Sequence, residues 1–299
     1  MKYCMIIASH QPPKIFFEML RTLSRYNSVR IYIIDSSPEE VANEIFSYVQ
    51  NLNEINKATI FLFFHIKNMG VGNKYNFGID RCLIEDCHLI TLLTDDVILD
   101  ESKFDPDRIM SYFSKYCDRK KDILSLVSED RIPVADNDIY KIHLAVDTGM
   151  TFSSELIRKF RFNEGFVIDQ VDTYFCYLVI KSGGKMITFD ASGVSSLPVG
   201  REVSGGQHCL PYWRLYLLAR NSLWMFLEER DLLLFKSFFF QTRFWSLRGV
   251  ESKQRILKIL FSVTSGIFDA LTNKLGVTSS LQKLSGNRFD SIPEQTLIK

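Results

Sequence analysis

The chain has 299 residues, of which 46% are hydrophobic and 24% are charged, and its formal net charge is +1 at pH 7. This length predicts two domains, or one large domain with an appendage, and the near-neutral charge excludes a bulk electrostatic attraction to nucleic acid or anionic lipid. No apolar run reaches the ~18–20 residues of a membrane span, and the apolar run after Met1 and Lys2 is too short for a signal peptide.

The first hundred residues alternate between strand and helix patterns. Strands are predicted at 3–7, 29–34, 59–65 and 89–93, and helices at 14–25, 38–52 and from 76 to about 85. This alternation predicts βαβ units and an α/β fold with a mostly parallel central sheet. Ligands of such sheets bind at the carboxyl ends of the strands.

The pattern loosens after Asp105-Pro106. Helices are predicted at 106–116 and 169–181, a polar loop at 131–138, and strands at 123–127, 139–145, 149–152 and 186–189. From Pro211 onward the pattern is almost entirely helical. The glycine-containing loop 199–207 is the best domain boundary. We therefore predict a catalytic domain at 1–205, with halves at about 1–100 and 101–205, and a helical C-terminal region at 206–299.

The cysteine pattern indicates the redox state. The chain contains six cysteines: Cys4, Cys82, Cys87, Cys117, Cys176 and Cys209. Their spacing includes neither a CxxC pair nor the framework of a disulfide-rich domain. We therefore expect reduced thiols of a cytoplasmic protein rather than disulfides or zinc ligands.

Polar residues follow two of the predicted strands. Asp35 ends the second strand, Asp95-Asp96 follows the fourth, and a glycine-rich stretch at 68–78 lies between them. Each has an ordinary alternative: a helix cap or Asx turn for Asp35, a turn for the acidic pair, and a plain loop for the glycines. The glycine-rich stretch lacks GxxxxGK[ST] and is not a GxGxxG after the first strand. A P-loop and a classical dinucleotide fold are therefore not favoured.

A set of short motifs occurs in the order found in one known family. The motifs are Asp35-Ser36-Ser37; Asn68, Gly70, Gly72, Asn76 and Gly78; Thr94-Asp95-Asp96; Thr148-Gly149; and the segment from Phe166 to Asp172. Together they resemble family 2 inverting glycosyltransferases, which have the nucleotide-sugar fold called GT-A. The resemblance covers most of residues 3–221. With the Arg-x-Tyr-x-x-x-Arg-Asn pattern at 214–221, it is greatest for bacterial rhamnosyltransferases of surface polysaccharides such as O-antigen. Galactofuranosyltransferases are a close second.

The resemblance implies an acceptor site that contains Asp169, Asp172 and Gly149. Inverting transfer needs a base for the proton of the acceptor hydroxyl, and by residue match this base is Asp172. Asp169 would bind the acceptor sugar or tune Asp172, since residues three apart at a helix start share a face. The alternative is an acidic pair that complements a helix dipole.

The implied donor site comprises Ser9, Asp35, Asn68, Gly70, Asn76, Asp95, Arg214 and Arg220. Either arginine can neutralise phosphate because its guanidinium makes bidentate contacts, although salt bridges along a helix are the alternative.

The implied cofactor is Mg²⁺ or Mn²⁺, held by Asp96, because both ions prefer oxygen ligands and bind diphosphate. The chain departs from the family pattern at two positions: Thr94 replaces the first acid of Asp-x-Asp, and Leu197 stands where a histidine is usual. His208 is the nearest substitute for that histidine.

The C-terminal region interleaves aromatic and basic residues. Its run at 232–240 is mostly leucine and phenylalanine, with basic residues on either side. This pattern is typical of a helix in a membrane interface, which would place the protein peripherally at the inner face of the cell membrane. Packing on the catalytic domain and a homodimer interface are the alternatives. A nucleic-acid partner is not favoured, because no reader motif is present.

The sequence thus predicts a cytoplasmic inverting glycosyltransferase that moves rhamnose from dTDP-rhamnose onto a surface-polysaccharide or lipid-linked acceptor. A galactofuranosyl- or other hexosyltransferase that uses a UDP-sugar is the alternative. A nucleotidyltransferase would need a glycine-rich basic signature after the first strand, and Ser9-His10-Gln11 does not provide one. A non-catalytic sugar-nucleotide-binding subunit is a rival from another class of protein.

Overall fold

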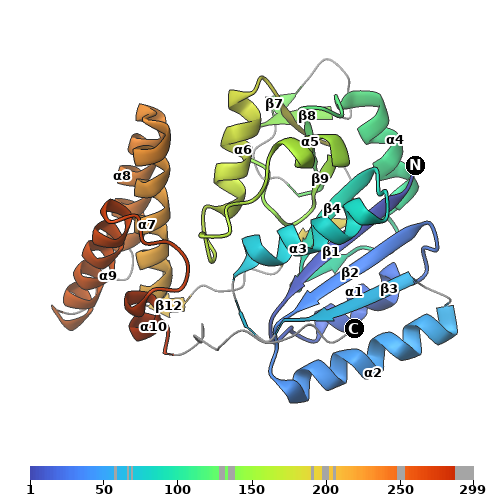
Figure 1. Cartoon of the computed structure of the whole chain (residues 1–299), viewed down its shortest axis with the longest axis horizontal. Helices are drawn as coiled ribbons and strands as arrows, with labels where there is room; N and C mark the ends of the chain where they lie inside the picture. Colours follow the sequence, from blue (N-terminus) through green and yellow to red (C-terminus); the bar gives the residue numbers. More distant parts are fainter. Residues whose placement is uncertain are drawn as a thin grey trace.

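The computed structural model describes residues 1–56, 59–65, 67–68, 70–127, 132–133, 139–189, 192–196, 202–204, 207–247 and 253–286. A nine-stranded sheet carries helices on both faces, and a further group of helices lies at one end (Figure 1). The strands of this sheet are β1 (Tyr3–Ser9), β2 (Val29–Asp35), β3 (Thr59–Phe64), β4 (Leu89–Thr94), β6 (Ile123–Ser125), β7 (Ile132–Pro133), β8 (Ile139–Ile142), β9 (Met150–Ser153) and β10 (Met186–Phe189). Two small sheets pair β5 (Val97–Leu99) with β11 (Val194–Ser196) and β12 (Glu202–Ser204) with β13 (Gln207–Cys209). The helices are α1 (Ile15–Leu23), α2 (Glu39–Asn56), α3 (Val71–Ile84), α4 (Pro106–Tyr116), α5 (Ser154–Lys159), α6 (Val171–Lys181), α7 (Tyr212–Glu229), α8 (Leu232–Leu247), α9 (Lys253–Leu271) and α10 (Ser279–Ser285).

The strand order of the large sheet is β3-β2-β1-β4-β9-β6-β10-β8-β7. Strands β1 to β4 are mutually parallel, with Ser9 opposite Asp35 and Ala8 opposite Thr94. Their carboxyl ends therefore meet at one edge. Strand β9 then runs antiparallel between β4 and β6. The predicted α/β class with a large central sheet is confirmed.

Two hydrophobic cores cover the two faces of the sheet. Cys4 and Ile6 of β1 pack with α3 in one core, whereas Tyr3 and Met5 pack with α1 in the other. This alternation follows from the two-residue period of a strand. Because both of their faces are covered, β1, β2 and β4 are almost entirely apolar and are easily recognised from the sequence.

Helix α3 begins earlier than the sequence predicts. The expected start was near residue 76, but the helix begins at Val71, with Gly70 as its N-cap. The Val71 amide donates to the Val167 carbonyl at 2.8 Å, so a distant loop caps this helix. The glycine-rich stretch is therefore largely helical, which local propensity did not indicate. The predicted loops at 131–138 and 199–207 lie mostly outside the described residues, as does the boundary at 205/206, which stays a prediction.

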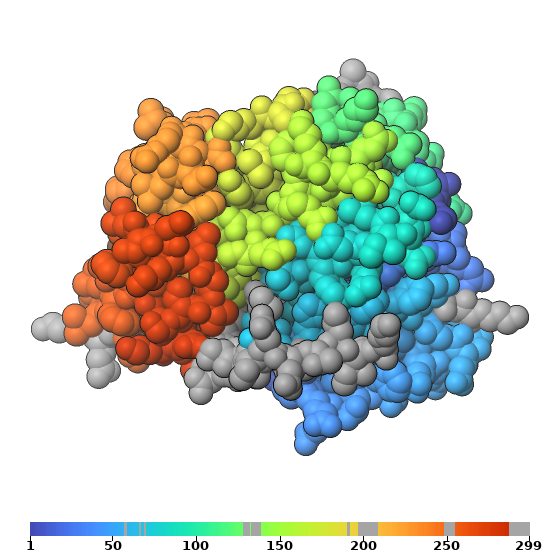
Figure 2. Space-filling view, in the orientation of Figure 1, coloured from blue at the N-terminus to red at the C-terminus, as the bar shows by residue number. Residues whose placement is uncertain are grey.

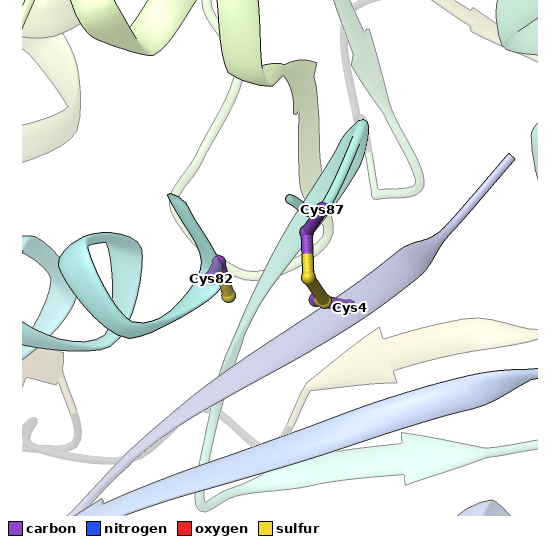
Figure 3. Close-up of side chains that lie close together, drawn as sticks. All are labelled: Cys4, Cys82 and Cys87. Atoms are coloured by element: carbon purple, nitrogen blue, oxygen red, sulfur yellow. A yellow bond between two sulfur atoms is a disulfide. The ribbon is translucent and has the colours of Figure 1, made fainter. Parts of the chain in front are cut away.

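Three cysteines, Cys4, Cys82 and Cys87, lie close together (Figure 3), two of them at the amino-terminal ends of β1 and β4. Cys4 and Cys87 form a disulfide, with Cα atoms 6.4 Å apart, and Cys82 of α3 lies beside them, the three sulfurs being within 4.8 Å of one another. The prediction that all six cysteines are reduced is wrong for this pair. A sequence separation of 83 hid the pairing, which depends on β1 lying beside β4.

The C-terminal helices pack around α7. Helices α8, α9 and α10 all contact it, and together the four helices form one end of the molecule, drawn from orange to red in Figure 2. Gly266 of α9 approaches α7 so closely that a Cβ atom there would lie 2.5 Å from the Tyr216 carbonyl oxygen. Among the described residues, no helix is long and apolar enough to cross a membrane.

Candidate functional site

The ends of β1, β2 and β4 bring three predicted donor residues together. Ser9 ends β1 beside Asp35 of β2, and the backbone N–H of His10 donates to Asp95 Oδ2 at 2.8 Å. Burial raises the pKa of Asp95 to about 6, and that hydrogen bond opposes the rise. The structure thus joins Ser9, Asp35 and Asp95 at the edge where ligands of parallel sheets bind.

Lys74 is a member of this cluster that sequence reasoning missed. Its ammonium is almost fully buried and donates to the Ser9 carbonyl at 2.7 Å. Burial lowers the pKa of Lys74 to about 8, although the nearby charges of Asp35 and Asp95 oppose the shift. In the sequence, the available signal for Lys74 was its position within the glycine-rich stretch. Its burial depends on α3 beginning at Val71, which the sequence did not predict.

Asp35 has the alternative role that its sequence allowed. Its carboxylate accepts hydrogen bonds from the Ser37 backbone N–H at 2.9 Å and from the Ser37 hydroxyl at 2.8 Å. This is an Asx turn that leads toward α2. The side chain is fully buried in the structure. Donor binding by Asp35 stays a prediction, and the turn is the role that its contacts define.

The glycine-rich stretch packs against protein. A Cβ atom on Gly70 would lie 2.3 Å from the Val167 carbonyl oxygen, and one on Gly72 would lie 2.8 Å from that of Asn163. The buried Asn76 side chain donates to the Phe162 carbonyl at 2.9 Å. These contacts hold the 162–167 loop against α3. Donor binding by Gly70, Asn76 and Asn68 stays a prediction.

Asp96 lies in the turn between β4 and β5. Its Oδ1 atom is buried and has no hydrogen-bond partner within the described part of the chain, as is also true of the Ser9 hydroxyl. Such an orphaned carboxylate oxygen fits a cation ligand, because buried charges are otherwise paired. Among the described residues, the one group of three His, Cys, Asp or Glu ligand atoms within 4.8 Å of one another is that of Cys4, Cys82 and Cys87. Asp96 is therefore not part of a preformed three-residue metal cluster within the described residues. Position 197 and the side chain of His208 lie outside the described residues.

Asp147 is the second residue that sequence reasoning missed. It accepts hydrogen bonds from the Tyr75 hydroxyl at 3.0 Å and from the Thr148 backbone N–H at 2.9 Å. Burial and the charge of Asp172 raise its pKa to about 7, and the charge of Asp96 acts in the same direction. In the sequence, the available signal for Asp147 was its position just before the Thr148-Gly149 motif. In the structure, β9 pairs with β4, and this pairing brings the segment before β9 toward Asp96.

Gly149 supports this segment. Its N–H donates to the Leu92 carbonyl at 2.8 Å, and its own carbonyl accepts from the Leu126 N–H at 3.0 Å. A φ of +82° and the close approach to Leu126 both require glycine here. Acceptor binding by Gly149 stays a prediction, whereas its structural role, bridging β4 to the residue after β6, is plain.

Asp172 occupies the first turn of α6. Burial raises its pKa, and the neighbouring charge of Asp169 adds to this shift. The two residues before the helix, Asp169 and Gln170, have φ values of +58° and +66°. Consecutive left-handed residues other than glycine are strained, and such strain clusters at functional sites.

Arg214 and Asn221 of α7 hold this strained segment. Arg214 forms a two-point ion pair with Asp169, with Nε to Oδ2 at 3.1 Å and a second contact from Nη2 to Oδ1. Asn221 donates to the Asp169 carbonyl at 2.8 Å and to that of Ile168 at 3.0 Å. Sequence reasoning noted Asn221 only as part of a motif. Phosphate binding by Arg214 stays a prediction.

Arg220 lies behind this segment, where its Nε donates to the side-chain oxygen of Asn221 at 3.0 Å. Its guanidinium is fully buried and donates to the Gly276 carbonyl at 2.7 Å and to the Gly165 carbonyl at 3.2 Å. It thereby joins the segment after α9 to the loop before α6. Donor binding by Arg220 stays a prediction that these contacts do not favour.

The arrangement of strands and helices is that of the GT-A glycosyltransferase fold. A mannosyltransferase from Pyrobaculum calidifontis, solved with GDP-Man and Mn²⁺, is similar with a TM-score of 0.56 and 12% identity, over 95% of this chain and 79% of that one. A GalNAc-transferase solved with UDP, GalNAc and Mn²⁺ gives 0.54 and 10%, over 91% of this chain and 58% of that one. This chain thus spans little more than half of the second structure. No protein-family model and no curated protein matches the present chain. Likeness at this identity establishes the fold alone.

Proposed function

We propose that the protein is an inverting glycosyltransferase that uses a nucleotide-sugar donor. The observation that supports this most is the convergence of Asp95 and Asp96, after β4, with Asp147 and Asp172, from the other half of the sheet. The charges of Asp96 and Asp172 both act on Asp147. A GT-A fold with acidic groups from both halves at one edge suits a donor and an acceptor that meet there.

The general base in this proposal is Asp172. A carboxylate with an ordinary pKa near 4 accepts protons weakly, and the raised pKa of Asp172 makes it a stronger base. The ion pair with Arg214 keeps Asp169 beside it and fixes the start of α6. In this role Asp172 takes the proton of the acceptor hydroxyl as the new glycosidic bond forms.

Asp96 is the proposed holder of a divalent cation. Its buried Oδ1 lacks a partner among the described residues, and the adjacent Asp95 adds charge. A bound Mg²⁺ or Mn²⁺ would neutralise the diphosphate of the departing nucleotide. We propose His208 as a further ligand from sequence alone.

The donor we propose is dTDP-rhamnose, with a surface polysaccharide or a lipid-linked glycan as acceptor. This choice rests on the sequence motifs at 166–172 and 214–221. A UDP-linked hexose is the second candidate. A thermal-shift screen with dTDP-, UDP- and GDP-sugars separates them, because a ligand that binds the native state raises its stability.

The substitution Asp172→Asn tests the proposed function. We expect kcat to fall by on the order of 10²–10⁴-fold, the usual contribution of a general base, while the thermal shift with nucleotide stays unchanged. The matched control is Asp107→Asn on the exposed surface of α4, which should leave both quantities unchanged. A non-catalytic subunit would show no turnover in the wild-type protein with any donor, and this result would refute the proposal.

A further inference from the structure

Helix α8 is an apolar helix that lies on the surface. Only Leu234 and Thr242 of its sixteen residues are buried. Large apolar side chains stand exposed along its whole length: Leu232, Leu233, Phe235, Phe239, Phe240, Phe244 and Leu247. A helix with apolar residues on all sides is normally enclosed, and an exposed apolar surface of this extent marks an interaction site.

The charges on this helix have one sign. Lys236 and Arg243 are exposed among the apolar side chains of α8, and α8 contains no acidic residue. The neighbouring α9 carries three basic residues, and its one acid, Asp269, is buried against Tyr216. Since the whole chain has a net charge of only +1, the rest of the molecule is net acidic. The positive charge is therefore concentrated where the apolar side chains are exposed.

Helix α9 repeats the pattern. Its exposed apolar side chains are Ile256, Leu257, Leu260, Phe261, Phe268 and Leu271, with Lys258 among them. Both helices pack on α7, at the end of the molecule that Figure 2 shows in orange and red. Helix α8 also contacts the segment before α6, because the Gln170 side chain donates to Gln241 of α8 at 2.8 Å, next to Asp169.

We propose that the exposed face of α8 docks on an anionic lipid surface. Its phenylalanine and leucine side chains would enter the boundary between headgroups and acyl chains, and Lys236 and Arg243 would contact anionic headgroups. A second copy of the chain fits less well, because an isologous contact would set the basic residues of one α8 against those of the other. The surface exists whether or not the protein transfers sugars.

The test is co-sedimentation of the full chain with lipid vesicles, without any sugar donor. We expect binding to vesicles of phosphatidylcholine mixed with phosphatidylglycerol, and much weaker binding to phosphatidylcholine alone. The double variant Phe240→Ser, Leu247→Ser removes side chains that are 65% and 64% exposed. It should lose about tenfold or more in vesicle affinity, because interfacial binding scales with buried apolar area.

The matched control removes equally exposed apolar side chains elsewhere. Ile55→Ser, Ile84→Ser changes two residues that are each 71% exposed, on α2 and α3, and should keep wild-type binding. Lys236→Gln, Arg243→Gln should abolish the preference for anionic vesicles. Unchanged melting temperatures would show that all three variants are folded. The proposal is overturned if the wild type binds neither kind of vesicle, if both serine variants bind equally, or if the α8 variant instead breaks a dimer measured by light scattering.

Discussion

At the scale of single residues, the site is governed by carboxylates that the fold partly removes from water. Burial raises the pKa of Asp95, Asp147 and Asp172 alike. The surrounding cations offset this only in part, because Lys74 is itself buried and Arg214 is paired with Asp169. An excess of half-buried acid is unfavourable for folding by itself, and it suits a site that binds a cation or moves a proton.

The stability of the protein should reflect the raised pKa of Asp147. Its folded pKa is about 7 and its ordinary value is 3.8, so between these pH values the folded state holds a proton that the unfolded state has lost. Stability therefore falls as the pH rises through this window. Asp147→Asn cannot titrate. We expect it to be more stable than the wild type at pH 8 by on the order of 1 kcal/mol, because the site is partly open to solvent.

Urea titrations at pH 5 and pH 8, with a chelator present, measure this effect. The gain from Asp147→Asn should shrink toward pH 5. Asp100→Asn is a control of opposite sign, because hydrogen bonds from Ser102 and Lys103 lower the pKa of the exposed Asp100 to about 2. That carboxylate stabilises the fold above about pH 4, so its removal should not help at pH 8. A gain for Asp147→Asn that is equal at both pH values would contradict the assignment.

Removal of the Asp96 carboxylate should abolish metal-dependent stabilisation. In the wild type we expect Mn²⁺ added with a nucleoside diphosphate to raise the melting temperature above that with nucleotide alone. In Asp96→Asn this metal-dependent increment should vanish, because the orphaned Oδ1 is the proposed ligand. The part due to nucleotide alone should remain. An unchanged increment in the variant would exclude Asp96 as a ligand.

At the scale of elements, the site is formed by loops that pack against the ends of helices and strands. The 162–167 loop packs against the start of α3 through Gly70 and Gly72. Arg214 and Asn221 of α7 hold the segment before α6. These glycines let one protein segment approach another, and donor binding by Gly70 stays a prediction.

The substitution Gly70→Ala should therefore damage the fold. Gly70 has a φ of +95°, and an added Cβ would lie 2.3 Å from the Val167 carbonyl oxygen. We expect a loss of about 3 kcal/mol in the free energy of unfolding, from backbone strain and overpacking together. Gly183→Ala isolates the strain, because Gly183 has a φ of +83° with nothing within 4 Å of the added atom. It should lose only about 1 kcal/mol. Equal losses would show that the contact with Val167 is unimportant.

The sequence predicted the elements better than the contacts between them. Strands β1, β2 and β4 were recognisable because they are covered on both faces and almost entirely apolar. The start of α3 was missed because a distant carbonyl, that of Val167, caps the helix. Asp147 and the Cys4–Cys87 disulfide were missed for the same kind of reason. Each depends on which strands lie beside β4, and the order of strands in a sheet cannot be predicted from local sequence patterns.

At the scale of the whole molecule, the C-terminal helices are joined to the rest of the chain through α7. Arg214 reaches Asp169, just before α6, from the first turn of α7, and Arg220 lies about two turns later in a fully buried position. Tyr216, between them, donates to the buried Asp269 of α9 at 2.6 Å. The exposed face of α8 is thus carried by a helix group that is itself fixed to the site. A surface contact at α8 would therefore fix how the candidate site lies relative to that surface.

A substitution of Arg220 tests whether this residue joins two segments of the chain or binds the phosphate of the donor. Arg220→Met leaves the Gly276 and Gly165 carbonyls without their donor, so we expect a loss of about 3 kcal/mol in the free energy of unfolding. Arg243→Met, on the exposed face of α8, should cost almost nothing. Urea unfolding measures both variants. If Arg220 binds donor phosphate, as its motif predicted, the variant should instead keep its stability and lose nucleotide affinity in the thermal-shift assay. The guanidinium is enclosed and already donates to two carbonyls from separate segments. We therefore expect the main effect to be a loss of stability, and any weaker nucleotide binding to result from loosening of the loop before α6.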